Sequence, residues 1–246
     1  RRVNEHNVDL NRNFVLAREQ FQPNDEKYTQ LNSFLNPTQI PSTTFLSRIE
    51  FLAKALYNIS KYSMESLRTS ILKGQYSHPK GVFYGGTETE IQSHLMTDLI
   101  QTFIKPYKKI FLIDLHTGYG ERSKLHLLSG KSTDQNSVSL LKVFDKDEID
   151  FADKKKFYAV DGELLTYFIN EIHLACKAVT IGVIFEYGTL DSQKITGSVE
   201  SLRRVILENQ NFHFPASAET TNEIKSLYKE MFYPSDHLWR AAVLQQ

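Results

Sequence analysis

The chain of 246 residues carries 29 Lys and Arg against 29 Asp and Glu, so its formal net charge is zero. This balance argues against a nucleic-acid or anionic-membrane partner, because neither electrostatic footprint is present. No apolar run approaches the roughly 18–20 residues of a membrane span, and the single cysteine, Cys176, excludes an intrachain disulfide framework. The length suits one domain over residues 1–246, and the cysteine content fits a reducing, cytoplasmic compartment.

The first part of the chain is predicted to hold a loop and two helices. Residues 20–44 contain three prolines among Asn, Asp and Gln and are expected to form a loop. A long helix is expected from about Ser42 to Ser70. Its apolar stripe has a three-to-four spacing and consists of Phe45, Ile49, Leu52, Leu56 and Ile59. A capping box of Thr87 and Glu90 is expected to open a second helix. The apolar face of this helix consists of Ile91, Leu95, Leu99 and Phe103.

Two apolar runs, residues 110–115 and 178–185, are typical of strands that are buried on both faces of a sheet. Shorter elements are expected between them. These are a strand at 125–128 and helices at 137–144 and 161–175, and two or three further helices follow the second run. This alternation of helices and strands predicts an α/β layer fold in which helices cover the sheet.

Polar side chains stand where each apolar run ends. Asp114 and His116 are two positions apart, so they share one face of the first strand, and Gly118 then allows a sharp turn. A neutral imidazole at a strand end can bind a metal through one nitrogen while an acceptor such as Asp114 holds the other. Glu186 ends the second run, where burial would raise its pKa and suit it to exchange protons with water. Structural hydrogen bonds to the backbone are the alternative for both His116 and Glu186.

Asn11 and Arg12 follow the short apolar segment at residues 8–10. A guanidinium can grip a carboxylate through two hydrogen bonds, and a neighbouring amide adds a donor. The alternative is an Arg paired with Asp9 for structural reasons. Tyr84, beside two glycines, can reach a substrate or can pack as an ordinary turn residue.

Four motifs in this order resemble those of the zinc carboxypeptidase superfamily, and the resemblance runs from residue 1 to about residue 190. They are Arg-Arg-Val-Asn-Glu-x-Asn-Val-Asp-Leu-Asn-Arg-Asn-Phe, His-Pro-x-Gly-x-Phe-Tyr-Gly-Gly, Asp-Leu-His-Thr-Gly and Glu-Tyr-Gly-Thr. The chain is most similar to a little-characterised branch of bacterial metallopeptidases, which is related to aspartoacylase and succinylglutamate desuccinylase. The resemblance implies a mixed, mostly parallel central sheet with helices on both faces and a single zinc ion.

The resemblance also implies roles for individual residues. His116 matches the family's third zinc ligand, and Glu186 matches the general base that activates the zinc-bound water and then protonates the leaving amine. Zinc lowers the pKa of its bound water toward 7 and polarises the carbonyl of the substrate.

The same resemblance assigns the basic residues. Asn11 and Arg12 match the pair that holds the terminal carboxylate of the substrate. Arg2 matches the arginine that stabilises the oxyanion, with Arg1 as the alternative. Tyr84 is included as a further residue for substrate binding.

One motif of the family is missing from this sequence. The other two zinc ligands come from a His-x-x-Glu segment that precedes the Asp-Leu-Asn-Arg segment, and no such motif is present. His6 and Asp9 have a similar spacing but lie inside the carboxylate-binding motif, so we do not assign them as zinc ligands. We expect the catalytic domain to lack its N-terminal portion, with the remaining ligands upstream of residue 1. This fragment alone would then be inactive, and sheet edges would be left uncovered.

The sequence therefore predicts a zinc-dependent hydrolase of the carboxypeptidase type, which cleaves an amide bond next to a free carboxylate. Its expected partner is a peptide or an N-acyl amino acid substrate. One alternative is a deacylase that acts on N-acyl amino acids, and another is a metal-free protein that only binds carboxylates.

Overall fold

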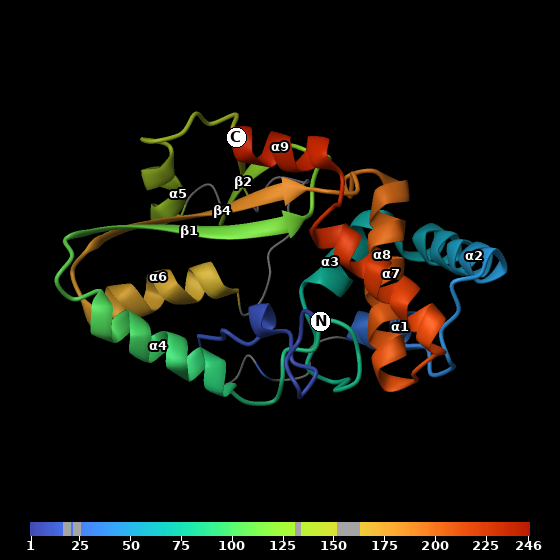
Figure 1. The fold of residues 1–246 in the computed structure, drawn as a ribbon. Coiled ribbons are helices and arrows are strands. Elements are labelled where there is room, and N and C mark those ends of the chain that lie inside the picture. The colour runs from blue at the N-terminus through green and yellow to red at the C-terminus, as the bar shows by residue number, and fades with distance from the viewer. Residues whose placement is uncertain (17–20, 22–25, 131–133, 152–162) are drawn as a thin grey trace.

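A four-stranded sheet and a group of helices beside it make up the computed structural model (Figure 1), which describes residues 1–16, 21, 26–130, 134–151 and 163–246. The strands are β1 (Lys109–Gly118), β2 (Leu125–Ser129), β3 (Ile149–Phe151) and β4 (Val179–Gly188). Their order in the sheet is β1-β4-β2-β3. β1 runs parallel to β4, β2 runs parallel to β3, and β2 and β4 are antiparallel. The predicted α/β fold with a mixed, mostly parallel sheet is confirmed.

Helices lie on both faces of the sheet (Figure 1). On one face α4 (Ile91–Phe103) packs against α6 (Leu164–Ala175), and on the other face α5 (Gln135–Leu140) packs against β4. Gly182 on β4 allows α6 to approach closely, because a Cβ atom at that position would lie 2.8 Å from Leu165 Cδ1. The sheet is therefore held by a close helix contact directly below the strands that carry the predicted site residues.

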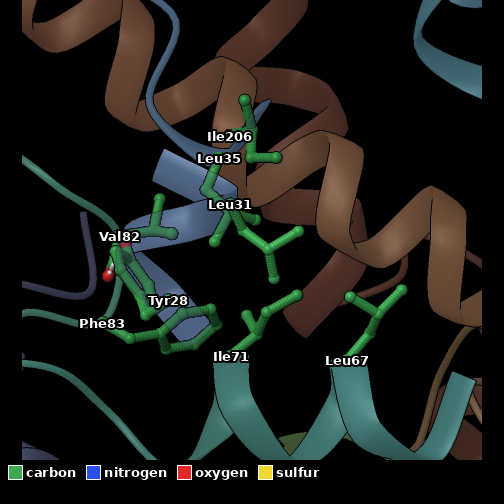
Figure 2. Packing of buried hydrophobic residues seen from close by; sticks show 8 residues of the cluster. All are labelled: Tyr28, Leu31, Leu35, Leu67, Ile71, Val82, Phe83 and Ile206. Carbon is green, nitrogen blue, oxygen red and sulfur yellow. Dashed lines mark hydrogen bonds between the residues drawn. The ribbon is translucent and has the colours of Figure 1, made fainter. Parts of the chain in front are cut away.

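Most of the remaining helices form a second packed group beside the sheet. They are α1 (Glu26–Leu35), α2 (Phe45–Tyr62), α3 (Met64–Leu72), α7 (Ile195–His213) and α8 (Ala218–Phe232). α9 (His237–Gln245) lies on the sheet instead (Figure 1), where Trp239 Nε1 donates to the carbonyl of Gly188 at 2.7 Å. Figure 2 shows the main apolar cluster of the second group, which consists of Tyr28, Leu31, Leu35, Leu67, Ile71, Val82, Phe83 and Ile206. The hydroxyl of Tyr28 donates to the carbonyl of Val82 at 2.7 Å, so its polar end is satisfied inside the cluster. This second core links α1, α3 and α7 to the turn around Val82.

Most predicted elements of the sheet region are found close to their expected places. The runs at 110–115 and 178–185 are β1 and β4, and the run at 125–128 is β2. The helix expected at 137–144 is α5, and the one expected at 161–175 is α6, whose expected first two residues lie outside the described residues. Two elements were missed. α1 lies within the expected loop, where prolines outweighed the apolar spacing of its buried residues, and β3 is too short to show a period.

The long helix predicted over 42–70 is wrong, because the structure has two helices, α2 and α3, that meet at Ser63. Ser63 has a φ of 66°, which breaks the helical backbone, and its hydroxyl accepts from Ser66 N at 3.2 Å to start α3. The capping box at Thr87 is also wrong. α4 begins at Ile91 with Glu90 at its N-cap, and the Glu90 side chain contacts His6 instead.

The two predicted apolar stripes also lie on the outside of their helices. On α2 the buried residue is Ala55, and on α4 the buried residues are Ser93 and Ile100. The members of the α4 stripe and most of the α2 stripe are exposed. A three-to-four spacing identifies an apolar face but does not identify what covers it.

The prediction that β1 is buried on both faces is wrong for a similar reason. β1 is an edge strand, and its burial alternates along the chain. The apolar residues on its outer face are exposed, and Leu115 is the extreme case at 71%. Among the described strands only β4 pairs with β1, so one edge of β1 is left without a neighbouring strand.

None of the described helices is both long enough and apolar enough to cross a membrane.

Candidate active site

The central pair of site residues comes from the ends of two parallel strands. His116 on β1 and Glu186 on β4 are direct partners in the strand register. Side chains opposite each other in neighbouring strands point to the same face. His116 Nδ1 lies 3.9 Å from Glu186 Oε2, so the imidazole and the carboxyl group face one small space. The two residues predicted for metal binding and proton transfer are therefore brought together.

Asp114 holds the other nitrogen of the His116 ring. His116 Nε2 lies 2.8 Å from Asp114 Oδ2, a close ion pair whose angle departs from that of an ideal hydrogen bond. Burial by itself lowers the pKa of His116, but the contact with Asp114 and the charges of Glu186 and Glu163 outweigh it, and the net pKa is raised. The Asp114 carboxylate thus leaves Nδ1 directed toward Glu186, an arrangement common among metal-binding histidines.

Glu186 is a buried carboxyl group, with 7% of its surface exposed. Burial raises its pKa to about 7, although the charge of His116 and a hydrogen bond from Tyr119 N oppose this increase. That N–H donates to Glu186 Oε1 at 2.9 Å and fixes one oxygen, while the other faces His116. A carboxyl group with a pKa near neutrality can both accept and return a proton at physiological pH.

Arg12 is almost completely buried, with 3% of its surface exposed. Its Nε and Nη2 donate to the carbonyl of Leu72 at 3.0 and 2.7 Å, and its Nη1 donates to the carbonyl of Asn11 at 2.9 Å. A guanidinium has five N–H groups, so these bonds leave one on each terminal nitrogen for another acceptor. The alternative pairing with Asp9 is loose, at 3.9 Å.

Asn11 and Arg2 also border the space in front of the strand ends. Asn11 Oδ1 accepts from Leu164 N at 3.0 Å, at the start of α6. Arg2 pairs with the Asp9 carboxylate and lies over the Phe83 ring, 4.5 Å from its centroid. The amide of Asn11 and the guanidinium of Arg2 are therefore held in place by their surroundings.

Arg1 and Tyr84 lie elsewhere. Arg1 contacts Glu208 at 3.1 Å and covers the Phe212 ring at 3.4 Å. Tyr84 is buried, and its carbonyl accepts from Asp9 N at 2.7 Å, so it supports the carboxylate-binding segment through its backbone. Neither residue is among the described residues that line the cavity described next.

A cavity of about 1070 Å³ joins the predicted site residues. Its described lining includes Arg2, Asn11, Arg12, His116 and Glu186. The predicted residues therefore share one space, except for Tyr84 and for Arg1, the alternative to Arg2.

Glu163 lines the same cavity and was not predicted. Burial raises its pKa, its Oε2 accepts from Thr166 Oγ1 at 2.7 Å, and its Oε1 is buried with no hydrogen-bond partner among the described residues. Tyr119 and Arg68, which also line the cavity, were missed as well. Nothing in the local sequence marks these three residues, because long-range packing brings them to the cavity.

The described residues provide only part of a metal site. Within the described ranges no group of three or more His, Cys, Asp or Glu side chains is arranged to hold a metal ion. His6 lies at the surface beside Glu90, 3.0 Å from its carboxylate, and far along the chain from His116. The residues present therefore fit one ligand position of a zinc site, supplied by His116 with Asp114 behind it.

The fold and the site together define an α/β protein with a largely apolar cavity that contains these charged side chains. The cavity lies at the carboxyl ends of two parallel strands, the usual place for a ligand in an open sheet. The chain belongs to the family described as "Protein of unknown function (DUF2817)", whose family model matches residues 1–246. No curated protein and no solved structure matches the chain at a significant level.

Proposed function

We propose that this chain carries the site of a zinc-dependent hydrolase of the carboxypeptidase type, which cleaves an amide bond next to a free carboxylate. The observation that supports this most is the pairing of His116 and Glu186. A buried carboxyl group with a pKa of about 7 faces the free nitrogen of an imidazole, and Asp114 holds the second nitrogen. The four motifs that resemble the zinc carboxypeptidase superfamily support the same reaction.

In this proposal each site residue has a role that follows from its place in the cavity. The remaining N–H groups of Arg12, with the Asn11 amide, bind the free carboxylate of the substrate and set the scissile bond before the strand ends. Glu186 takes a proton from the attacking water and passes it to the leaving amine. Arg2 donates to the oxyanion that develops on the carbonyl oxygen. A zinc ion held by His116 would lower the pKa of water and polarise the carbonyl.

Two further zinc ligands are required, and the described residues do not supply them. β1, which carries His116, has an open edge among the described strands, where a segment with such ligands would pair. Its outward side chains, Phe111, Ile113 and Leu115, are exposed directly before His116. An edge strand offers unpaired backbone groups with which an added strand would pair. The apolar face is perpendicular to that edge, so a further packed element would be needed to cover it.

The test measures zinc content and hydrolysis of C-terminally free peptides by this chain and by a form extended with any residues encoded before Arg1. We expect stoichiometric zinc and turnover in the extended form and weak zinc binding in the present chain. In the extended form Glu186→Gln should abolish turnover while zinc stays bound. Glu219→Gln, at an exposed site on α8, is the matched control and should keep full activity. Full turnover by Glu186→Gln would refute the assigned base.

A carboxylate-binding protein without catalysis is the second candidate. The single ligand position within the described residues favours it. An extended form that binds C-terminally free peptides but holds far less than one zinc per chain would support this candidate instead.

Deacylation of N-acyl amino acids stays a prediction, and a series of blocked amino acids tested beside free peptides separates it from peptidase activity. A cytoplasmic location also stays a prediction and is based on the single cysteine.

A further inference from the structure

The cavity extends beyond the strand ends into a lobe between α3 and α7. Its walls there are mostly aliphatic and include Ile59, Leu67, Ile71, Leu202 and Val205. This lobe lies beside the apolar cluster of Figure 2, which shares Leu67 and Ile71 with it. One cationic side chain, Arg68 on α3, lines the cavity among these residues.

Arg68 is held in place without an acidic partner among the described residues. Its Nη2 donates to the carbonyl of Ser192 at 2.9 Å and to Ser198 Oγ at 2.8 Å. Within the described part of the chain no carboxylate oxygen comes within 4.0 Å of its nitrogens, and Nε and Nη1 donate no hydrogen bond. Arg203 and Arg204 on the neighbouring α7 both pair with Glu200, so they show the usual arrangement. A partly desolvated guanidinium with unused donors gains from an anion.

Ser201 gives a second, independent indication. Its hydroxyl is buried and has no hydrogen-bond partner among the described residues, yet it lines the same cavity. Ser201 is three residues after Ser198 on α7, so both hydroxyls lie on the side of the helix that meets Arg68. A buried hydroxyl without a partner costs stability, and a bound acceptor would remove this cost.

The lobe adjoins the site described above. Arg68, Tyr119 and Glu186 all line the same cavity. The backbone N–H of Tyr119 donates to Glu186. A ligand whose reacting bond lies at Glu186 can therefore extend one side chain toward Arg68.

We propose that Arg68, which Ser198 holds in position, and Ser201 form a second anion subsite that binds a carboxylate at the end of an aliphatic side chain. This inference rests on the proposed function, in which Arg12 and Asn11 hold the first carboxylate. The substrate class is then an amide of an acidic amino acid with a flexible stem, such as a glutamyl group. The aliphatic walls of the lobe accommodate the stem, and Arg68 neutralises its end.

The test measures binding rather than turnover, by isothermal titration calorimetry at low salt. The probes are N-acetyl-L-glutamate and N-acetyl-L-glutamine, which are nearly equal in size and differ by one negative charge. We expect the glutamate compound to bind with a Kd roughly tenfold lower, the effect of one charge-assisted hydrogen-bonded contact. Arg68→Gln should abolish this preference, and Ser201→Ala should reduce it roughly threefold.

Two variants serve as matched controls and should retain the preference. They are Arg48→Gln and Ser226→Ala, which change exposed residues outside the described lining of the cavity. Ser201→Ala also guards against a folding defect in Arg68→Gln, because the Ser201 hydroxyl makes no hydrogen bond that the change could break. A roughly threefold smaller preference in Ser201→Ala with normal thermal unfolding supports the subsite even if Arg68→Gln does not fold.

The remaining outcomes overturn the inference in distinguishable ways. Equal binding of both probes by the unchanged protein, or an intact preference in Arg68→Gln and Ser201→Ala, removes the subsite but leaves the proposed function standing. If neither probe binds, the proposal that Arg12 and Asn11 bind a carboxylate is refuted. The subsite proposal is then refuted as well, because it depends on that binding.

Discussion

Glu186→Gln should stabilise the protein, and the gain should grow with pH. The change keeps an oxygen that can accept the hydrogen bond from Tyr119 N, and it removes a carboxyl group that must ionise in a buried position. A gain in stability from altering a proposed catalytic residue is expected when burial, rather than a structural bond, determines its pKa.

The size and sign of this effect follow from the shift in the pKa of Glu186. The value rises from 4.5 in the unfolded chain to about 7 in the folded protein. Between these values the folded state holds a proton that the unfolded state has released, so the free energy of unfolding falls as the pH increases. Across the whole window the loss is about 3 kcal/mol in the unchanged protein. The glutamine variant does not titrate at this position and escapes the loss.

The assay is urea-induced unfolding of both proteins at pH 5 and pH 8, with a chelator present to exclude metal binding. We expect the variant to gain about 2 to 3 kcal/mol relative to the unchanged protein between these two pH values. His116 is present in both proteins, so most of its own titration cancels in the comparison. Glu219→Gln changes an exposed residue and should alter the free energy of unfolding little at either pH. A difference that is flat, or that shrinks as the pH rises, would refute the assignment of the raised pKa to burial.

Three further predictions follow from other parts of the structure. In the zinc-bound form that we propose, Asp114→Asn should weaken zinc affinity by about 10- to 100-fold, because the His116 ring loses the carboxylate that orients it. Competition with a chelator measures this affinity. Leu140→Ala should lower the free energy of unfolding by about 2–5 kcal/mol, because Leu140 is fully buried. Leu141→Ala, a change at a partly exposed neighbour, should lower it far less. Equal losses would contradict the packing of α5. Leu115→Ser should reduce self-association of this chain in sedimentation experiments, because Leu115 projects from an open strand face, and an unchanged association constant would argue against this face as the contact.

The parts of the site that could be predicted are those with a local signal. The apolar runs at 110–115 and 178–185 locate β1 and β4, and the polar residue after each run marks the end of its strand. Because the two strands are parallel neighbours, their carboxyl ends meet, and His116 and Glu186 come together as expected. The order of the strands and the direct pairing of these two residues required the structure.

The parts that could not be predicted depend on contacts between distant segments. Arg68 reaches the cavity because α3 packs beside α7, and Glu163 reaches it from the start of α6. Neither residue stands in a motif or at the end of an apolar run. The apolar stripes of α2 and α4 are a second example. Their spacing is regular, but no surface among the described residues covers them, so the spacing did not predict burial.

The backbone pairing of β1 with β4 determines how His116 and Glu186 are placed relative to each other. Side chains alternate between the faces of a strand, so inserting one residue into β1 between Lys109 and Asp114 would turn His116 to the opposite face. Inserting two residues would restore the face but displace the imidazole along the strand from its carboxyl partner. The number of residues in each of these two strands is therefore constrained by the pairing of His116 with Glu186.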